Sequence, residues 1–99
     1  TDDPDAAAAD ADALITDWFV SMGDKDYDAR GAALSPYALD SARVAKAGPD
    51  AVVLHCLPAY RGQEISDAVM EGPQSAIWAE AENRLHAQKA ILTWCLQGD

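Results

Sequence analysis

The sequence has little cysteine, little positive charge and no long apolar run, and each shortage excludes a class of protein. Cys56 and Cys95 are far apart and form no CxxC pair, so we expect free thiols in a reducing cytoplasm, with no disulfide framework, metal site or cofactor. Only 7 Lys and Arg stand against 17 Asp and Glu, which argues against nucleic acid and anionic membrane surfaces as partners. No apolar run approaches the roughly 18 residues of a membrane span, and no signal peptide is predicted.

The chain is long enough for one domain and apolar enough to fill a core. It has 99 residues, of which 49% are hydrophobic, and we treat residues 1–99 as a single domain or half-domain. It opens at Thr1 without a Met and passes almost at once into helix-like sequence. We therefore expect a piece cut from something longer.

Helical and strand-like segments alternate along the chain. Asp3 and Pro4 are typical of a helix start, and the charged residues 24–31 indicate an exposed loop. In the last helix, Leu85, Leu92 and Leu96 are expected to form an inward stripe with Ile91 and Cys95. Strands are predicted at 13–16, 51–57 and 75–78, and helices at 4–11, 35–47, 64–71 and 82–96. This order predicts an α/β fold, a three-stranded parallel half of a doubly wound, Rossmann-like sheet with flanking helices.

Reactive side chains follow the predicted strands. The run 52–62 begins as a buried strand and ends in a turn that carries His55, Cys56 and Arg61. Right-handed crossovers would bring residues 17–21, 55–61 and 80–84 to one rim of the sheet. The plainer interpretation of 52–62 is a core strand followed by an ordinary loop.

Three segments resemble the ornithine carbamoyltransferase family, in the family's order and across nearly the whole chain. The letters HCLP at 55–58, followed by RG at 61–62 and EI at 64–65, are similar to its HCLP signature. Asp17, with SMG at 21–23, is similar to its ornithine loop, and AENRLHAQKA at 81–90 resembles the start of its carboxyl-terminal helix. The resemblance covers roughly the final third of such an enzyme, the latter half of the ornithine-binding domain. It implies a reaction of carbamoyl phosphate with L-ornithine that gives L-citrulline and phosphate.

On the ornithine side, the resemblance implies that Asp17 holds the amino groups of the substrate. A carboxylate at a strand end can bind an ammonium by charge-assisted hydrogen bonds, although without the SMG match a solvated loop Asp would be the better interpretation. Ser21 and the backbone of Met22 are implied as contacts to the amino-acid head. Met22 could instead be ordinary packing.

On the carbamoyl side, the resemblance implies Cys56, the Leu57 carbonyl and Arg84. Cys56 would lie where the substrates meet, without forming a covalent intermediate, and Arg84 would stabilise charge on carbamoyl phosphate. The Leu57-Pro58 bond is expected to be cis. Otherwise Cys56 would be inert core and Arg84 an exposed helix residue paired with a nearby Glu. His55 is interpreted as a satisfied strand histidine and not as a general base.

The chain also departs from the family pattern. Trp18 and Phe19 stand where the family more often has an apolar residue and then Trp, and position 40 is Asp where Asn is common. The family's Ser-Thr-Arg-Thr and His-Pro-x-Gln segments are missing from these residues, so we expect negligible turnover by the 99 residues alone. The alternative is an excised or designed half-domain with a structural role. Its exposed sheet edge would complete itself in a homodimer or larger homo-oligomer.

Overall fold

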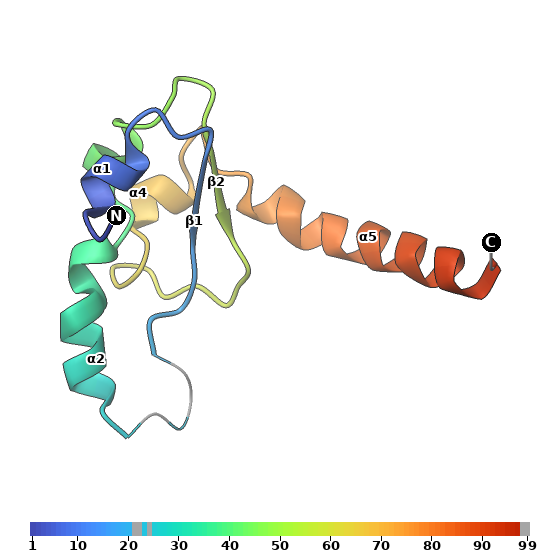
Figure 1. The fold of residues 1–99 in the computed structure, drawn as a ribbon, viewed down its shortest axis with the longest axis horizontal. Helices are drawn as coiled ribbons and strands as arrows, with labels where there is room; N and C mark the ends of the chain where they lie inside the picture. Colours follow the sequence, from blue (N-terminus) through green and yellow to red (C-terminus); the bar gives the residue numbers. More distant parts are fainter. Residues whose placement is uncertain (21–22, 24, 98–99) are drawn as a thin grey trace.

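A computed structural model describes residues 1–20, 23 and 25–97. Two parallel strands lie at the centre of the body, with short helices packed beside them and one long helix projecting away (Figure 1). The strands are β1 (Ala13–Thr16) and β2 (Val52–His55). The helices are α1 (Pro4–Ala8), α2 (Tyr27–Leu34), α3 (Ser41–Val44), α4 (Asp67–Met70) and α5 (Ile77–Gln97), with a 3-10 turn at Ser35–Tyr37.

The predicted α/β arrangement with a parallel sheet is confirmed. Ala13 pairs with Val52 and Thr16 pairs with His55, so both strands run the same way and end at the same level. The predicted start of α1 is also confirmed, because the Asp3 carboxylate accepts hydrogen bonds from the backbone of Asp5 and Ala6. The register matters for function because the residues that follow the two strands emerge side by side.

The prediction of a third strand at 75–78 is wrong. Among the described residues, Ser75 makes only a single parallel bridge to Val53, and the sheet contains just β1 and β2. The backbone becomes helical at Ile77, five residues before the helix start predicted at 82. Ala and Glu residues alternate at 79–82, and their high helix propensity extends α5 toward its N-terminus instead of prolonging a strand.

The segment predicted as an exposed loop at 24–31 contains most of helix α2. Position 24 lies outside the described residues, but Tyr27–Leu34 is helical and none of its residues is buried. The segment YDARGAAL has good helix formers at several positions. It lacks the apolar stripe that marks a packed helix, and the charges therefore suggested a loop.

The single helix predicted at 35–47 is broken in two. Leu39 lies between the 3-10 turn and α3, where its N–H donates to the Glu64 carbonyl and its carbonyl accepts from Ser66 N–H. Asp40 then caps α3 by accepting a hydrogen bond from Arg43 N–H at 2.8 Å. These long-range backbone bonds replace the helical bonds that local propensity favoured. The same pairing shortens the helix predicted at 64–71, which begins only at Asp67.

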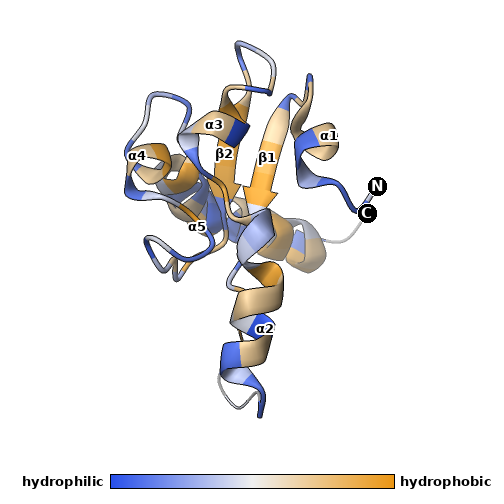
Figure 2. Ribbon diagram, turned by 90° about the vertical axis from the view of Figure 1, so that its left-hand side faces the viewer, coloured by the Kyte–Doolittle hydropathy of each residue, from blue (hydrophilic) through white to orange (hydrophobic). Residues whose placement is uncertain are grey.

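The core lies between the sheet and the short helices. Val53, Ile65 and Ile77 are almost fully buried at its centre. The strands are apolar in Figure 2, as expected for a sheet packed against helices. The buried apolar cluster comprises Ala8, Leu14, Leu39, Val44, Val53, Ile65, Val69, Met70 and Ile77.

Helix α5 does not fold back onto this core. The stripe predicted to face inward is exposed: Leu85 is 68%, Leu92 62% and Leu96 85% accessible. Only Ile77, at the first turn, is buried, and the remaining turns extend away from the body (Figure 1). The amphipathic pattern was real, but no described residue covers it. No helix among the described residues is long and apolar enough to cross a bilayer.

Candidate active site

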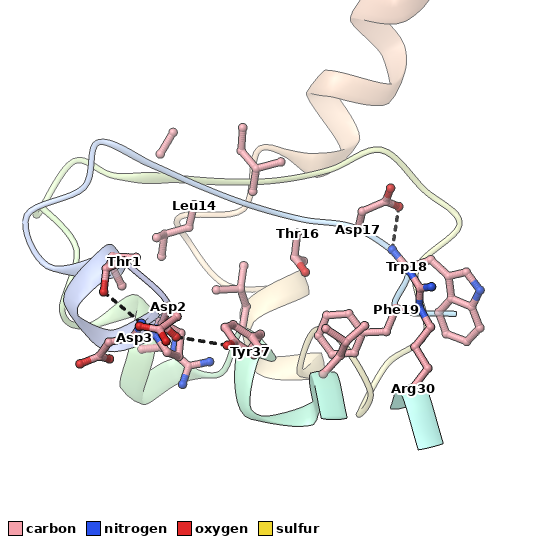
Figure 3. A pocket seen from close by; sticks show the side chains of 18 residues that line it. Thr1, Asp2, Asp3, Leu14, Thr16, Asp17, Trp18, Phe19, Arg30 and Tyr37 are labelled. Atoms are coloured by element: carbon pink, nitrogen blue, oxygen red, sulfur yellow. Dashed lines mark hydrogen bonds between the residues drawn. The ribbon is translucent and has the colours of Figure 1, made fainter. Parts of the chain in front are cut away.

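Asp17 and Cys56 meet at the carboxyl end of the sheet. Because Thr16 pairs with His55, the next residue on each segment is brought to the same point. The Cys56 thiol donates to the Asp17 carboxylate with Sγ and Oδ1 3.0 Å apart. Both side chains are exposed, and Asp17 points to the opposite side of the strand from Leu14 and Thr16 (Figure 3). The pair is therefore accessible to a small polar ligand.

Each member of this pair shifts the pKa of the other. The hydrogen bond from Cys56 lowers the pKa of Asp17 below its ordinary 3.8, and the Trp18 backbone N–H, 2.6 Å from Oδ1, lowers it further. The same carboxylate raises the pKa of the Cys56 thiol above its ordinary 9.0, with a smaller contribution from burial. At neutral pH the pair is thus a carboxylate and a neutral thiol, and such a thiol is a weak nucleophile.

His55 and Glu64 form a buried pair beneath the exposed one. His55 Nε2 lies 3.1 Å from Glu64 Oε1, and both side chains are inaccessible to solvent. His55 Nδ1 accepts a hydrogen bond from Leu57 N–H at 2.9 Å. Nδ1 therefore carries no proton, and Nε2–H is the donor to Glu64. The prediction of a satisfied strand histidine is confirmed.

The same network accounts for the shape of the turn after β2. Glu64 Oε1 also accepts from Tyr60 N–H at 2.5 Å, and the Leu57-Pro58 bond is cis, as predicted. Leu57 itself has φ 54°, the left-handed region that few non-glycine residues adopt. The local sequence thus builds a turn whose backbone is held by two buried side chains, with Cys56 at its outer edge.

Asp17, His55 and Cys56 together have the donor types of a metal site, with ligating atoms within 4.8 Å of one another. Both ring nitrogens of His55 already have partners, Leu57 N–H and Glu64. A metal ion would have to break one of these buried bonds and displace the thiol proton. We therefore assign the cluster to hydrogen bonding.

Arg84 approaches the pair from helix α5. Glu80 Oε2 accepts a hydrogen bond from His55 N–H at 3.0 Å, which joins the first turn of α5 to the end of β2. Arg84 lies one turn further along, on the same face as Glu80. His55, Cys56, Glu80 and Arg84 line one cavity of about 590 Å³. Among the described residues Arg84 has no ion-pair partner, so the pairing with a nearby Glu is not formed.

Of the predicted site residues, the structure brings Asp17 into contact with Cys56 and places Cys56 and Arg84 on one cavity, with Leu57 next to Cys56 in the turn. Ser21 and Met22 lie outside the described residues. Sequence reasoning did not assign a role to Glu64, although its place in the RGxEI segment pointed to it. It also did not anticipate that Trp18 stacks on Tyr60, with ring centroids 3.5 Å apart.

A second hollow, of about 530 Å³, lies along β1 and is shown in Figure 3. Thr1, Thr16, Asp17, Arg30 and Tyr37 are among its lining residues. It touches Asp17 but includes neither Cys56 nor Arg84. Asp17 therefore lines this hollow, Cys56 and Arg84 line the cavity beside α5, and the Asp17–Cys56 hydrogen bond lies between the two.

Known proteins resemble this chain over nearly its whole length. Residues 1–95 match the family model described as aspartate/ornithine carbamoyltransferase, Asp/Orn binding domain. This chain belongs to that family. It is 60% identical over 97 residues to the ornithine carbamoyltransferase of Methanoculleus marisnigri, and 55% identical over 95 residues to that of Caulobacter vibrioides. These alignments cover 97% and 96% of the chain, but only 31% and 30% of the relatives.

The fold of the chain is also found among solved family members. The structure of the Pyrococcus furiosus ornithine carbamoyltransferase matches with a TM-score of 0.83 at 45% identity. The match covers 91% of this chain and 29% of that structure. The chain thus has the length of about a third of the relatives it matches, and the arrangement of its strands and helices is that of the family's Asp/Orn binding domain.

Proposed function

We propose that this chain supplies the L-ornithine side of a carbamoyltransferase site. In the reaction, the side-chain amine of ornithine attacks the carbonyl carbon of carbamoyl phosphate, a C–N bond forms, and the C–O bond to phosphate breaks. The attacking amine loses a proton, and L-citrulline and phosphate are released. The observation that carries the proposal is the Asp17–Cys56 contact, whose thiol also lines the cavity that Arg84 lines. The two free thiols suit a reducing cytoplasm.

Asp17 would bind the ammonium groups of ornithine. Its lowered pKa keeps the carboxylate charged at neutral pH, and a carboxylate is a strong acceptor for ammonium hydrogen bonds. Ordering the carboxylate for binding costs little conformational entropy, because the exposed carboxylate is already oriented by the Trp18 N–H. Ser21 and the Met22 backbone would contact the amino-acid head, in keeping with the family pattern.

Cys56 and Leu57 would contact the reacting groups, and Arg84 would bind the carbamoyl phosphate. The raised pKa of Cys56 keeps it a neutral thiol, so it acts as a hydrogen-bonding group and not as a nucleophile. The Leu57 carbonyl would accept from the attacking amine. The Arg84 guanidinium would stabilise negative charge as it develops on oxygen, a role for which its planar fork of donors is suited.

A chimera tests the proposal. These 99 residues would replace the matching segment of the Methanoculleus marisnigri relative, and citrulline formation would be measured. The parent chimera should be active. Asp17→Asn should raise KM for ornithine about 10- to 150-fold, the effect of losing one hydrogen bond to a charged group. Arg84→Gln should lower kcat, whereas Cys95→Ser should change neither constant.

A folded chimera that forms no citrulline would contradict the proposal, as would an Asp17→Asn variant with an unchanged KM. The 99 residues alone should turn over negligibly. Citrulline formation by them at a rate near that of the full-length relative would contradict this expectation.

Self-association is the second candidate. One edge of β1 is unpaired among the described residues, and Ile15 on that strand is 69% exposed. Helix α5 adds an exposed apolar stripe along one of its faces. The stripe consists of Trp78, Leu85, Leu92 and Leu96, each at least half exposed, whereas the exposed Ile91 and Trp94 lie on other sides of the helix. Light scattering on a sizing column tests this candidate, and a monomer at tens of micromolar would count against it.

A further inference from the structure

The Asp17–Cys56 contact lies just beyond the last paired residues of the sheet. The register of β1 and β2 ends at Thr16 and His55. Past these residues, no backbone hydrogen bond in the described part of the chain joins the segment 17–20 to the turn 56–62. The strand register brings Asp17 and Cys56 to the same point, and past it only side-chain contacts can fix how the Asp17 carboxylate lies against the Cys56 thiol. A thiol is a weak donor, and an exposed hydrogen bond of this kind cannot fix two segments by itself.

Trp18 and Tyr60 make the other contact between the same two segments. Their rings are stacked, with centroids 3.5 Å apart and an interplanar angle of 28°. Trp18 is half-buried and also meets Tyr27 at 6.3 Å in a tilted arrangement. Stacked aromatic pairs gain energy beyond the area that they bury. The stack therefore contributes more free energy to holding the two segments together than the thiol–carboxylate hydrogen bond does.

The backbone N–H of each stacked residue donates a hydrogen bond to a side chain of the site. Trp18 N–H donates to Asp17 Oδ1, the oxygen that also receives the Cys56 thiol. Tyr60 N–H donates to the buried Glu64, which fixes the turn that carries Cys56. A movement of either ring would therefore change the position of the carboxylate relative to the thiol.

We propose that the Trp18–Tyr60 stack is the device that positions the Asp17 carboxylate against the Cys56 thiol. Trp18 and Tyr60 are positioning residues, and neither needs to touch substrate. The inference rests on the proposed function only in treating the Asp17–Cys56 pair as a substrate contact. The stack itself is tested without any substrate, so its failure and the failure of the proposed function are distinguishable.

The test is the pH dependence of Cys56 alkylation by iodoacetamide. A Cys95→Ser background leaves Cys56 as the only thiol. In Trp18→Ala and in Tyr60→Leu the midpoint should move to lower pH, toward that of Asp17→Asn. At pH 8 the rate should rise about three- to tenfold, the effect of losing one hydrogen bond to the thiol form.

The midpoint separates positioning from simple exposure. Greater access to the thiol would raise the rate at every pH and leave the midpoint in place. Tyr60→Phe keeps the ring and should keep the parent profile, as should Trp94→Ala on the far part of α5. The double variant Trp18→Ala, Tyr60→Leu should shift no further than either single variant, because both remove the same contact.

Two results would overturn the proposal: an unchanged midpoint in Trp18→Ala and Tyr60→Leu, or a shift in Tyr60→Phe as large as in Tyr60→Leu. Circular dichroism of each variant shows that the thiol is measured in a folded chain. If Trp18→Ala unfolds, Tyr60→Leu and Tyr60→Phe still decide the question.

Discussion

Removing the Glu64 carboxylate should destabilise the chain far more than removing an exposed one. Glu64 is fully buried and accepts from the buried His55 Nε2–H and from the backbone N–H of Tyr60, a residue that is 40% exposed. Glu64→Ala leaves the buried His55 donor without a partner, at about 1–3 kcal/mol, and removes the Tyr60 hydrogen bond, at about 0.5–1.5 kcal/mol, or about 2–4 kcal/mol together. The turn that carries Cys56 would lose its anchor with them.

Glu64→Gln is the matched variant. Its amide oxygen can replace Oε1 and satisfy both donors. Its amide nitrogen would occupy the place of Oε2, which has no hydrogen-bond partner in the described structure. That single unsatisfied group should cost about 1–3 kcal/mol, roughly half of the cost of Glu64→Ala. Glu82→Ala, exposed on α5, should stay within about 0.5 kcal/mol of the parent.

Urea denaturation followed by circular dichroism measures these differences. With an m-value of about 1–3 kcal/mol per M, Glu64→Ala should lower the midpoint by about 1–3 M and Glu64→Gln by about half as much. Equal midpoints for Glu64→Ala and Glu64→Gln would refute the reasoning, because the loss of both hydrogen bonds would then cost no more than one unsatisfied amide nitrogen. If Glu64→Ala does not fold, the smaller shift of Glu64→Gln relative to Glu82→Ala remains measurable.

Three further predictions follow from the site and the core. Asp17→Asn removes the carboxylate that raises the pKa of Cys56, so the alkylation profile of the thiol should move to lower pH. The pair should stabilise the fold fully between about pH 4 and 9. Because the pKa of Asp17 is lowered, this stabilisation is lost only when acid protonates the carboxylate; because the pKa of Cys56 is raised, it is lost only when base deprotonates the thiol. Urea midpoints of Asp17→Asn and of the parent, measured within this range and below it, check the direction of the pH dependence. A difference between the two midpoints that widens below pH 3 would contradict it. Ile77→Ala, fully buried, should cost about 2–5 kcal/mol, whereas Leu96→Ala, 85% exposed, should stay within about 0.5 kcal/mol; equal urea midpoints for the two would contradict the packing of α5.

Local signals predicted the elements whose ends are set by short-range chemistry. Asp3 before Pro4 starts a helix wherever the chain places it, because the cap is satisfied within one turn. The apolar run before His55 forms a strand because its β-branched residues suit a pleated, half-buried surface, and one face of it, with Val53 and His55, is buried. Parallel pairing then brings Asp17 and Cys56 together, so this part of the candidate site could be predicted.

Other features depended on partners distant in the sequence. Leu39 breaks a predicted helix because its backbone bonds to Glu64 and Ser66, and no local pattern reports that competition. The stack of Trp18 on Tyr60 joins residues 42 positions apart only after the two strands have paired. The link between β2 and α5 through Glu80 likewise exists only in the folded chain.

The sequence by itself determined the family, the alternation of helices and strands, and the side chains at the ends of β1 and β2, since these depend on residue types at short spacing. Only the tertiary structure decided that the predicted third strand is reduced to one bridge and that α5 leaves its apolar face uncovered. It also decided that the hydrogen-bond partner of His55 Nε2 is Glu64. Each of these outcomes is a competition between a local preference and a contact made across the fold. Only the assembled chain sets the energy of that contact.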